Sequence, residues 1–182
     1  MKKIIFVLGG CRSGKSRFAL SYANSHYKNK VFLATSQALD KEMERRIEIH
    51  KKNRGKDWLT LEEPVEIGSS LKSLKNGVDV VLIDCITLWV NNLFLAGEGE
   101  EEILSRTVEL REVMKNISPS LIVVSNEVGT GIVPDNKIAR LFRDIAGIVN
   151  QKLAQYSDIV VMTVAGIPQV IKGGLSSSAG SS

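Results

Sequence analysis

The chain has 182 residues, enough for one domain with a substantial hydrophobic core. Apolar residues make up 43% and charged residues 24%, which is typical of a soluble globular protein and excludes the fibrous and disordered classes. The net charge of +4 comes from dispersed basic residues, which favours an anionic ligand and gives only weak support for nucleic acid.

Two further features bear on where the protein works. Cys11 and Cys85 have no metal-ligand spacing, so free thiols in a reducing compartment are expected. No apolar run reaches the length of a membrane span, so no stable membrane insertion is expected. The apolar run "IIFVL" near the start is too short for a signal peptide and leads directly into glycines. We therefore expect a cytoplasmic protein.

Along the chain, short apolar runs alternate with segments of helical periodicity. The apolar runs predict strands at 2–10, 30–36, 58–63, 78–84, 120–129 and 158–166. The periodic segments predict helices at 14–25, 39–54, 64–75, 87–96, 100–115 and 134–155. Such alternation predicts an α/β fold with a mostly parallel central sheet covered on both faces. We expect one domain over residues 1–172 and a disordered, low-complexity tail over 173–182.

The strongest motif is "GGCRSGKS", which lies between the first predicted strand and the first predicted helix. It fits the phosphate-binding pattern G-x-x-x-x-G-K-[ST], whose backbone N–H groups surround phosphate oxygens at a helix N-terminus. The lysine would reach the β- and γ-phosphates, and the last hydroxyl would be a ligand of Mg²⁺. The predicted nucleotide-binding residues here are Gly9, Gly10, Cys11, Arg12, Ser13, Gly14, Lys15 and Ser16.

The run "VDVVLID" places Asp84 at the carboxyl end of a buried strand. An acid at that position lies beside the phosphate loop and can hold Mg²⁺ directly or through water. The pattern is weak alone and convincing together with the loop. We predict a nucleotide and metal site formed by Ser16 and Asp84, within a three-layer α/β/α P-loop nucleoside triphosphatase fold.

The sequence lacks the motifs that are typical of two common classes of P-loop protein. A signalling GTPase carries N-K-x-D and D-x-x-G motifs, and neither occurs here. A motor or recombinase ATPase often has a glutamate beside the metal-binding acid, and the neighbour here is Cys85. These absences favour a small-molecule transferase.

His50 lies in the basic run "RRIEIHKKNR". On a helix it shares a face with Met43 and Ile47, while Arg46 and Arg54 lie four residues to either side. One interpretation is a half-buried structural histidine on a basic helix. The other is a neutral imidazole, kept neutral by the positive charges, that attacks a phosphorus atom. The residues alone slightly favour the first interpretation.

Longer stretches resemble a known family. "GGCRSGKS", "ATSQALDKEMERRIEIHKKNR", "VLIDCITLWVNNLF", "SNEVGTGIVPDNKIARLFRDIAGIVNQKLA" and "VAGIP" resemble the bifunctional adenosylcobinamide kinase/adenosylcobinamide-phosphate guanylyltransferases of cobalamin biosynthesis. The resemblance extends to about Lys172. It implies phosphorylation of adenosylcobinamide by ATP or GTP with Mg²⁺, followed by transfer of GMP from GTP through a guanylylated histidine to give adenosylcobinamide-GDP. Here that histidine is His50, within R-I-x-x-H.

The resemblance implies several further properties. Lys15 and His50 would be the catalytic residues, adenosylcobinamide and its phosphate the substrates, and a homotrimer the assembly. "NEVG" (126–129) and "RLFRD" (140–144) match the family without a clear role, and a strand-end network and a helical ion pair explain them structurally. The family's further GTP contacts fall here on Ala34, Thr35, Ser36, Lys51, Lys52, Asn53, Arg54 and Glu62.

A function of another class remains open from the residues. A RecA-like ATPase could use the basic segment to contact nucleic-acid phosphates. That alternative predicts hydrolysis stimulated by nucleic acid with a steep salt dependence. The transferase interpretation predicts no such partner.

Overall fold

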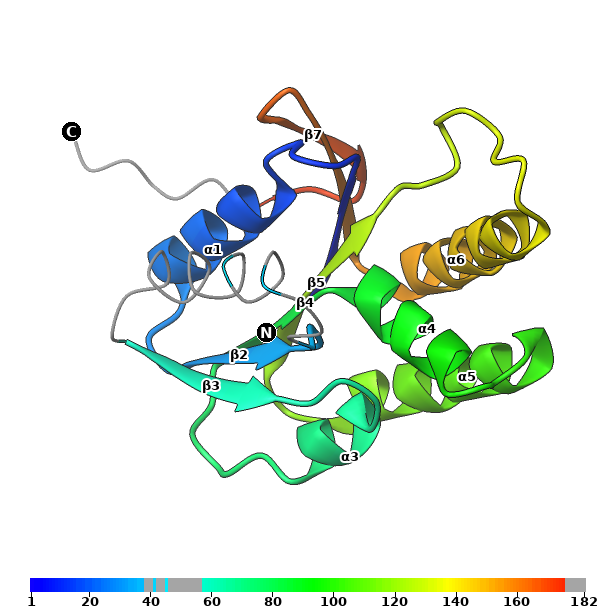
Figure 1. Ribbon diagram of the computed structural model, residues 1–182. Helices are drawn as coiled ribbons and strands as arrows, with labels where there is room; N and C mark the ends of the chain where they lie inside the picture. The colour runs from blue at the N-terminus through cyan, green and yellow to red at the C-terminus, as the bar shows by residue number, and fades with distance from the viewer. Residues whose placement is uncertain (38–40, 42–44, 46–56, 176–182) are drawn as a thin grey trace.

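The computed structural model describes residues 1–37, 41, 45 and 57–175. Their strands form one seven-stranded sheet in the order β3-β2-β4-β5-β1-β6-β7 (Figure 1). The strands are β1 (Ile4–Gly9), β2 (Lys30–Ala34), β3 (Trp58–Glu62), β4 (Val80–Asp84), β5 (Ser120–Asn126), β6 (Ile159–Val164) and β7 (Ile167–Lys172). All neighbouring pairs are parallel except β6 and β7. The predicted α/β class and mostly parallel sheet are confirmed.

Helices cover both faces of the sheet (Figure 1). The described helices are α1 (Lys15–His26), α3 (Ile67–Lys72), α4 (Ile86–Leu95), α5 (Glu100–Asn116) and α6 (Lys137–Tyr156). On one face, α1 packs Ala19, Tyr22 and Ala23 against the sheet. On the other face, α3 to α6 bury a larger core that includes Trp89 and Val149. The predicted three-layer arrangement follows from these two apolar clusters.

The strand sequences explain why the sheet is buried. The central strands β1, β4 and β5 are nearly continuous apolar runs, and their side chains alternate between the two clusters. Ile5 and Val7 enter the α1 layer, whereas Phe6 and Leu8 enter the opposite layer. At the carboxyl edge the apolar runs end together, which brings polar residues from separate parts of the chain to one edge.

The last strand differs from the prediction. We predicted a single strand over 158–166, whereas β6 ends at Val164 and the chain turns back as β7. The turn residues Ala165 and Gly166 have φ of 51° and 84°, as a tight two-residue hairpin requires. The register pairs Val164 with Ile167. The predicted core strand is present as β6 and ends two residues earlier than predicted, at the Ala-Gly turn, whereas the exposed strand β7 was not predicted.

Two helices also have boundaries that differ from the predicted ones. Helix α6 begins at Lys137 rather than at Pro134, because the Asn136 side chain accepts hydrogen bonds from the N–H groups of Ile138 and Ala139. Helix α3 is shorter than the predicted 64–75. The predicted helix over 39–54 and residues 176–182 of the predicted tail lie outside the described residues.

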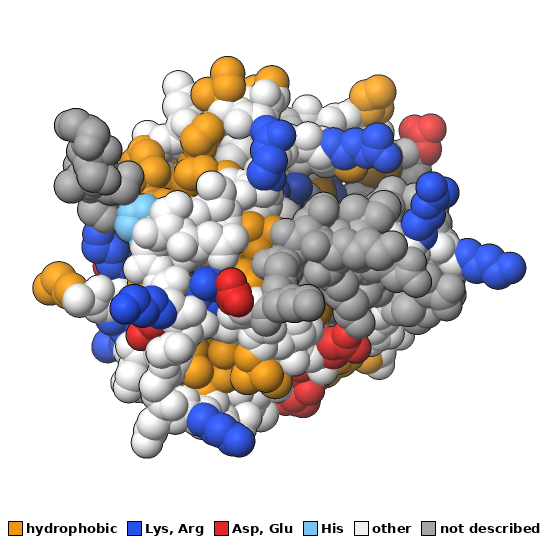
Figure 2. Space-filling model, turned by 90° about the vertical axis from the view of Figure 1, so that its left-hand side faces the viewer, with side chains coloured by type: hydrophobic (Ala, Val, Ile, Leu, Met, Phe, Trp, Pro, Cys, Tyr) orange, Lys and Arg blue, Asp and Glu red, His pale blue; other side chains and the backbone are white. Residues whose placement is uncertain are grey.

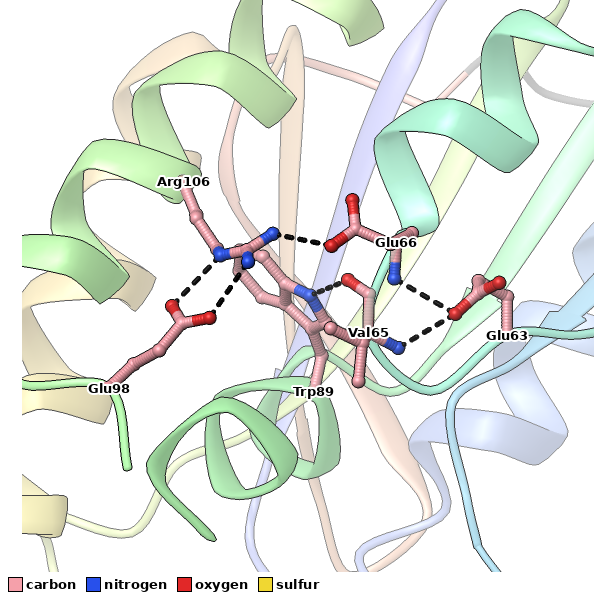
Figure 3. Close-up of polar contacts among 6 residues, drawn as sticks. All are labelled: Glu63, Val65, Glu66, Trp89, Glu98 and Arg106. Carbon is pink, nitrogen blue, oxygen red and sulfur yellow. Dashed lines mark hydrogen bonds and ion pairs between the residues drawn. The ribbon is translucent and has the colours of Figure 1, made fainter. Parts of the chain in front are cut away.

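A surface cluster fixes the start of α3 against α5 (Figure 3). Arg106 forms ion pairs of 2.8 Å with both Glu66 and Glu98. The hydrogen bonds that the Arg106 guanidinium donates to Glu66 and Glu98 raise its pKa. The Trp89 indole N–H donates to the carbonyl of Val65 at 2.8 Å. Together these contacts join the start of α3 to α4 and α5.

No helix in the described part of the chain is long and apolar enough to cross a membrane.

Candidate active site

The loop between β1 and α1 has the backbone shape that a phosphate site requires. Gly14 has φ of 97°, which favours glycine, and Arg12 has φ of 54°. At Gly9 a Cβ atom would lie 2.3 Å from Ser13 Oγ and 2.4 Å from Thr163 Oγ1, so only glycine fits there. The first and last glycines of the motif are therefore explained by this structure.

The hairpin of β6 and β7 braces the loop from the side. Ser13 Oγ and Thr163 Oγ1 are 2.8 Å apart, and the Gly166 N–H donates to the carbonyl of Ser13 at 2.8 Å. Both hydroxyl-bearing side chains are buried. The loop thus keeps its shape partly through contacts with a strand about 150 residues away in the sequence, and partly through the Ser13 N–H, which donates to the carbonyl of Gly10 at 3.3 Å.

The end of α1 at this loop is suited to an anion. Its N-cap is Gly14 and no side chain caps the first turn, so N–H groups there are available to phosphate oxygens. Lys15 is 9% exposed and its Nζ donates to the carbonyl of Gly10 at 2.9 Å. The lysine is thereby held across the loop, in the orientation from which it can contact a bound phosphate.

Asp84 ends β4 at the same edge of the sheet and lines the same cavity as Lys15 and Ser16. The Ser16 hydroxyl and the Asp84 carboxylate are hard oxygen donors of the kind that Mg²⁺ prefers, with phosphate oxygens completing its shell. In the described chain no group of three or more His, Cys, Asp or Glu side chains could hold a metal ion. The donor set of Ser16 and Asp84, with phosphate oxygens as the remaining ligands, fits a nucleotide-bound Mg²⁺.

Thr35 holds the backbone that follows Asp84. Its hydroxyl donates to the carbonyl of Cys85 at 2.7 Å and accepts from the Cys85 N–H at 2.8 Å. Thr35 is 0% exposed, and Asn92 donates to its carbonyl and to that of Pro64. Thr35 was predicted to contact nucleotide. Its hydroxyl is instead directed at the Cys85 backbone, where it positions the end of β4.

Cys85 follows Asp84 in the chain and is buried. Burial, and then the negative charge of Asp84, raise the pKa of its thiol to about 12. The thiol therefore stays protonated at neutral pH and is a poor nucleophile. Cys11, in the loop, is exposed.

The cavity that these elements enclose measures about 620 Å³. It brings together most of the predicted loop residues with Ala34, Ser36 and Asp84, whereas Gly9, Gly10, Thr35 and Glu62 do not line it. Arg12, Lys15 and Arg17 supply three cations against the single carboxylate of Asp84. The lining residues are Cys11, Arg12, Ser13, Gly14, Lys15, Ser16, Arg17, Phe32, Ala34, Ser36, Asp84, Cys85, Leu88, Asn126, Ala165 and Gly166.

Several lining residues were not predicted, notably Arg17, Phe32 and Asn126. Asn126 carried a usable signal, because it follows the buried run "SLIVVS" as Asp84 follows "VVLI". The carboxyl ends of parallel strands meet at one edge, so both residues should have been placed together. Arg17 and Phe32 had no such signal. His50 and Lys51, Lys52, Asn53 and Arg54 lie outside the described residues.

Elsewhere on the face that includes α1, the basic side chains of the described residues are dispersed. Figure 2 shows Lys and Arg side chains of the described chain dispersed over this face, separated by uncharged and apolar surface. A larger depression of about 800 Å³ lies between α3 and α5 and includes Lys72, Glu109 and Val113, none of which reaches the phosphate loop. The smaller cavity differs from this depression in having three basic side chains and a single carboxylate among its lining residues.

Comparison with solved structures supports the fold. The RadB recombinase matches with a TM-score of 0.52 at 16% identity, over 88% of this chain and 73% of that one. A protein of Pyrococcus horikoshii matches with a TM-score of 0.55 at 10% identity, over 96% of this chain and 88% of that one. At these identities the likeness is one of fold alone.

Comparison with characterised sequences is far more specific. The bifunctional adenosylcobalamin biosynthesis protein CobP of Pseudomonas aeruginosa is 39% identical over 167 residues, 92% of this chain and 96% of its own. The protein CobU of the same description from Salmonella typhimurium is 39% identical over 181 residues, 93% of this chain and 99% of its own. The model of the cobinamide kinase/cobinamide phosphate guanyltransferase family matches residues 5–171. This chain belongs to that family.

Proposed function

We propose that this protein phosphorylates adenosylcobinamide with ATP or GTP and then transfers GMP from GTP to the product, giving adenosylcobinamide-GDP in adenosylcobalamin synthesis. The observation that carries the proposal is the family match over residues 5–171, which includes the phosphate loop, Asp84 and the His50 segment. Relatives at 38–39% identity bear the name bifunctional adenosylcobalamin biosynthesis protein. One domain, residues 1–172, would carry both activities.

The kinase step needs a positioned triphosphate and neutralised charge, and the cavity offers both. The loop N–H groups and the start of α1 bind phosphate oxygens, while Lys15 neutralises the transferred group. Ser16 and Asp84 would hold Mg²⁺, which supplies charge neutralisation between the β- and γ-phosphates. No protein nucleophile is required, because the substrate hydroxyl attacks directly.

The guanylyl step is proposed to proceed through His50. A ring nitrogen attacks the α-phosphorus of GTP, a P–N bond forms, and pyrophosphate leaves with the electrons of the broken P–O bond. A phosphate oxygen of adenosylcobinamide phosphate then attacks the same phosphorus, and the P–N bond breaks to restore the imidazole. A covalent intermediate splits one reaction between two anions into two easier steps. The positive charges of Arg46 and Arg54 in the sequence support a neutral, nucleophilic imidazole.

Other residues complete the proposal. Ala34 and Ser36 line the nucleotide cavity, which supports their assignment as GTP contacts. Lys51, Lys52, Asn53, Arg54 and Glu62 keep the same proposed role on the family pattern alone. A homotrimer in the cytoplasm is proposed on the same ground, and sedimentation equilibrium tests the assembly.

The direct test is incubation with Mg²⁺ and GTP labelled at the α-phosphate, followed by denaturing electrophoresis. We expect a labelled protein band, acid-labile and alkali-stable as a phosphorus–imidazole bond should be, and release of the label to adenosylcobinamide phosphate. Labelling at the γ-phosphate should leave the protein unlabelled and label adenosylcobinamide. A protein that forms no adduct, but hydrolyses ATP faster with nucleic acid, would contradict the proposal.

A further inference from the structure

Asn126 occupies the strand end between the two halves of the nucleotide site. Strand β5 lies between β1, which leads into the phosphate loop, and β4, which ends at Asp84. In the sheet register Asn126 is the partner of Gly9, the first residue of the loop. Its side chain lines the same cavity as Lys15 and Asp84. Because Lys15 is the loop residue that reaches the β- and γ-phosphates, a side chain that lines the same cavity is placed to reach the transferred group.

The backbone of Asn126 is fixed by a closed ring of hydrogen bonds. Its N–H donates to Thr87 Oγ1 at 2.7 Å, and its carbonyl accepts from Asn150 Nδ2 at 3.0 Å. Ser125 Oγ donates to Asn150 Oδ1 at 2.7 Å and lies 3.0 Å from Thr87 Oγ1. Ser125 uses its one proton on Asn150, so Thr87 is the donor in its 3.0 Å bond to Ser125, and the four bonds then run in one direction; the Thr87 hydroxyl also has a longer contact of 3.5 Å with the Asn126 carbonyl.

This ring is buried and uses no side-chain atom of Asn126. Thr87, Ser125 and Asn150 are all buried, from α4, β5 and α6 respectively. Bonds aligned in one direction polarise each other and stiffen the group that they hold. The amide of Asn126 itself, half-buried at the cavity, has no hydrogen-bond partner among residues 1–37, 41, 45 and 57–175. A rigid backbone thus presents a free amide to the cavity.

We propose that the Asn126 side-chain amide donates a hydrogen bond to the γ-phosphoryl group during the kinase step, and that Thr87, Ser125 and Asn150 are positioning residues for it. The inference rests on the proposed function. In that step the acceptor oxygen bonds to the γ-phosphorus and the bond to the bridging oxygen breaks. The nucleoside diphosphate leaves with the bonding electrons, and the hydroxyl proton passes to solvent. The amide stabilises the equatorial oxygens while this happens.

The first test deletes the amide. Asn126→Ala keeps every bond of the ring, so we expect a folded protein with unchanged affinity for ADP, which has no γ-phosphate. Its kinase kcat should fall by about 10²-fold, the usual loss for one transition-state donor. Asn116→Ala is the matched control, because Asn116 lies before β5 at the opposite edge and bonds only to the carbonyl of Glu112 among the described residues. It should keep full activity.

The second test separates donation from acceptance. Asn126→Asp places a carboxylate against the phosphate, so its kinase kcat should be as low as that of Asn126→Ala or lower. A variant Asn126→Asp with near wild-type kcat would overturn the proposal, since the residue would then act as an acceptor. So would an Asn126→Ala protein with undiminished kcat.

The third test addresses the ring. Ser125→Ala should lower kcat while ADP affinity stays unchanged, and the double variant with Asn126→Ala should be no slower than Asn126→Ala alone. Additive losses would contradict positioning. Wild-type protein without kinase activity would instead contradict the proposed function, which keeps the two failures distinct.

Discussion

The ring beneath Asn126 and the ion-pair cluster around Arg106 are both polar networks that join three elements of the fold. Around Arg106, each guanidinium bond meets a carboxylate, and Glu63 accepts from the N–H groups of Val65 and Glu66 (Figure 3). The ring also satisfies its own atoms, yet it holds the backbone of Asn126, whose side-chain amide lines the nucleotide cavity. A network whose polar groups bond only to one another serves the scaffold. One that presents an unpaired group to a cavity is suited to a ligand.

The largest loss common to both reactions should come from Lys15, in the phosphate loop. Lys15→Ala removes the cation held across the phosphate loop, and both reactions need a triphosphate seated there. We expect losses of at least about 10²-fold in both kinase and guanylyl transfer, with the protein still folded by circular dichroism. Near-normal turnover in a folded variant would mean that the loop does not hold the nucleotide in these reactions.

Substitutions at Asp84 test the metal-binding part of the nucleotide site. Asp84→Asn should raise the Mg²⁺ concentration needed for half-maximal rate in both steps, because the amide is a weaker ligand than the carboxylate. Asp84→Glu keeps the charge and should retain more activity than Asp84→Asn. Mg²⁺ titrations of the three proteins measure this directly. If Asp84→Asn had an unchanged Mg²⁺ dependence, another residue would hold the metal.

Two fully buried threonines provide a matched pair for stability. Thr35→Val leaves the N–H and carbonyl of Cys85 unpaired in the interior, a cost of about 1–3 kcal/mol for each unsatisfied group. Thr107→Val removes only a donor to the carbonyl of Ile103 within α5, and should cost about 1 kcal/mol. Urea unfolding gives both values. Equal losses would show that Thr35 has no special role at the end of β4.

The smallest effect is expected at the ion-pair cluster around Arg106. Arg106 is one-third exposed, so its ion pairs should contribute only about 0.2–1 kcal/mol each. Arg106→Ala should therefore lower the free energy of unfolding slightly, and salt should reduce the difference. Kinase activity should not change. A large kinase loss in Arg106→Ala would contradict the distinction between the two networks.

Much of the fold could be predicted because the signals are local. Buried runs such as "VVLID" identify strands, and the loop motif requires a strand before it and a helix after it, as the structure has them. Strand β7 was missed because its six residues are all exposed and Pro168 argues against a strand. The Ala165–Gly166 turn was the available local signal.

The site was less predictable where contacts cross long sequence separations. Nothing near Thr35 indicates that its hydroxyl meets the Cys85 backbone, 50 residues away. The bracing of Ser13 by Thr163 is equally invisible in the sequence. Loop residues with a fixed motif spacing could be predicted, whereas residues placed by tertiary packing could not.

His50 is the residue on which the two proposed reactions separate. Phosphoryl transfer needs no protein nucleophile, so His50→Ala should retain much of the kinase activity while guanylyl transfer falls by several orders of magnitude. His26 is the matched control, because its Nδ1 lies 2.9 Å from the Tyr22 carbonyl near the end of α1 and its ring stacks on that tyrosine. His26→Ala should still take up GMP.

The most direct measurement is the intact mass of each protein after treatment with GTP and Mg²⁺. We predict a gain of one GMP in the wild type and in His26→Ala, and none in His50→Ala. An adduct that persists in His50→Ala and disappears in His26→Ala, or no adduct in any of the three, would contradict it.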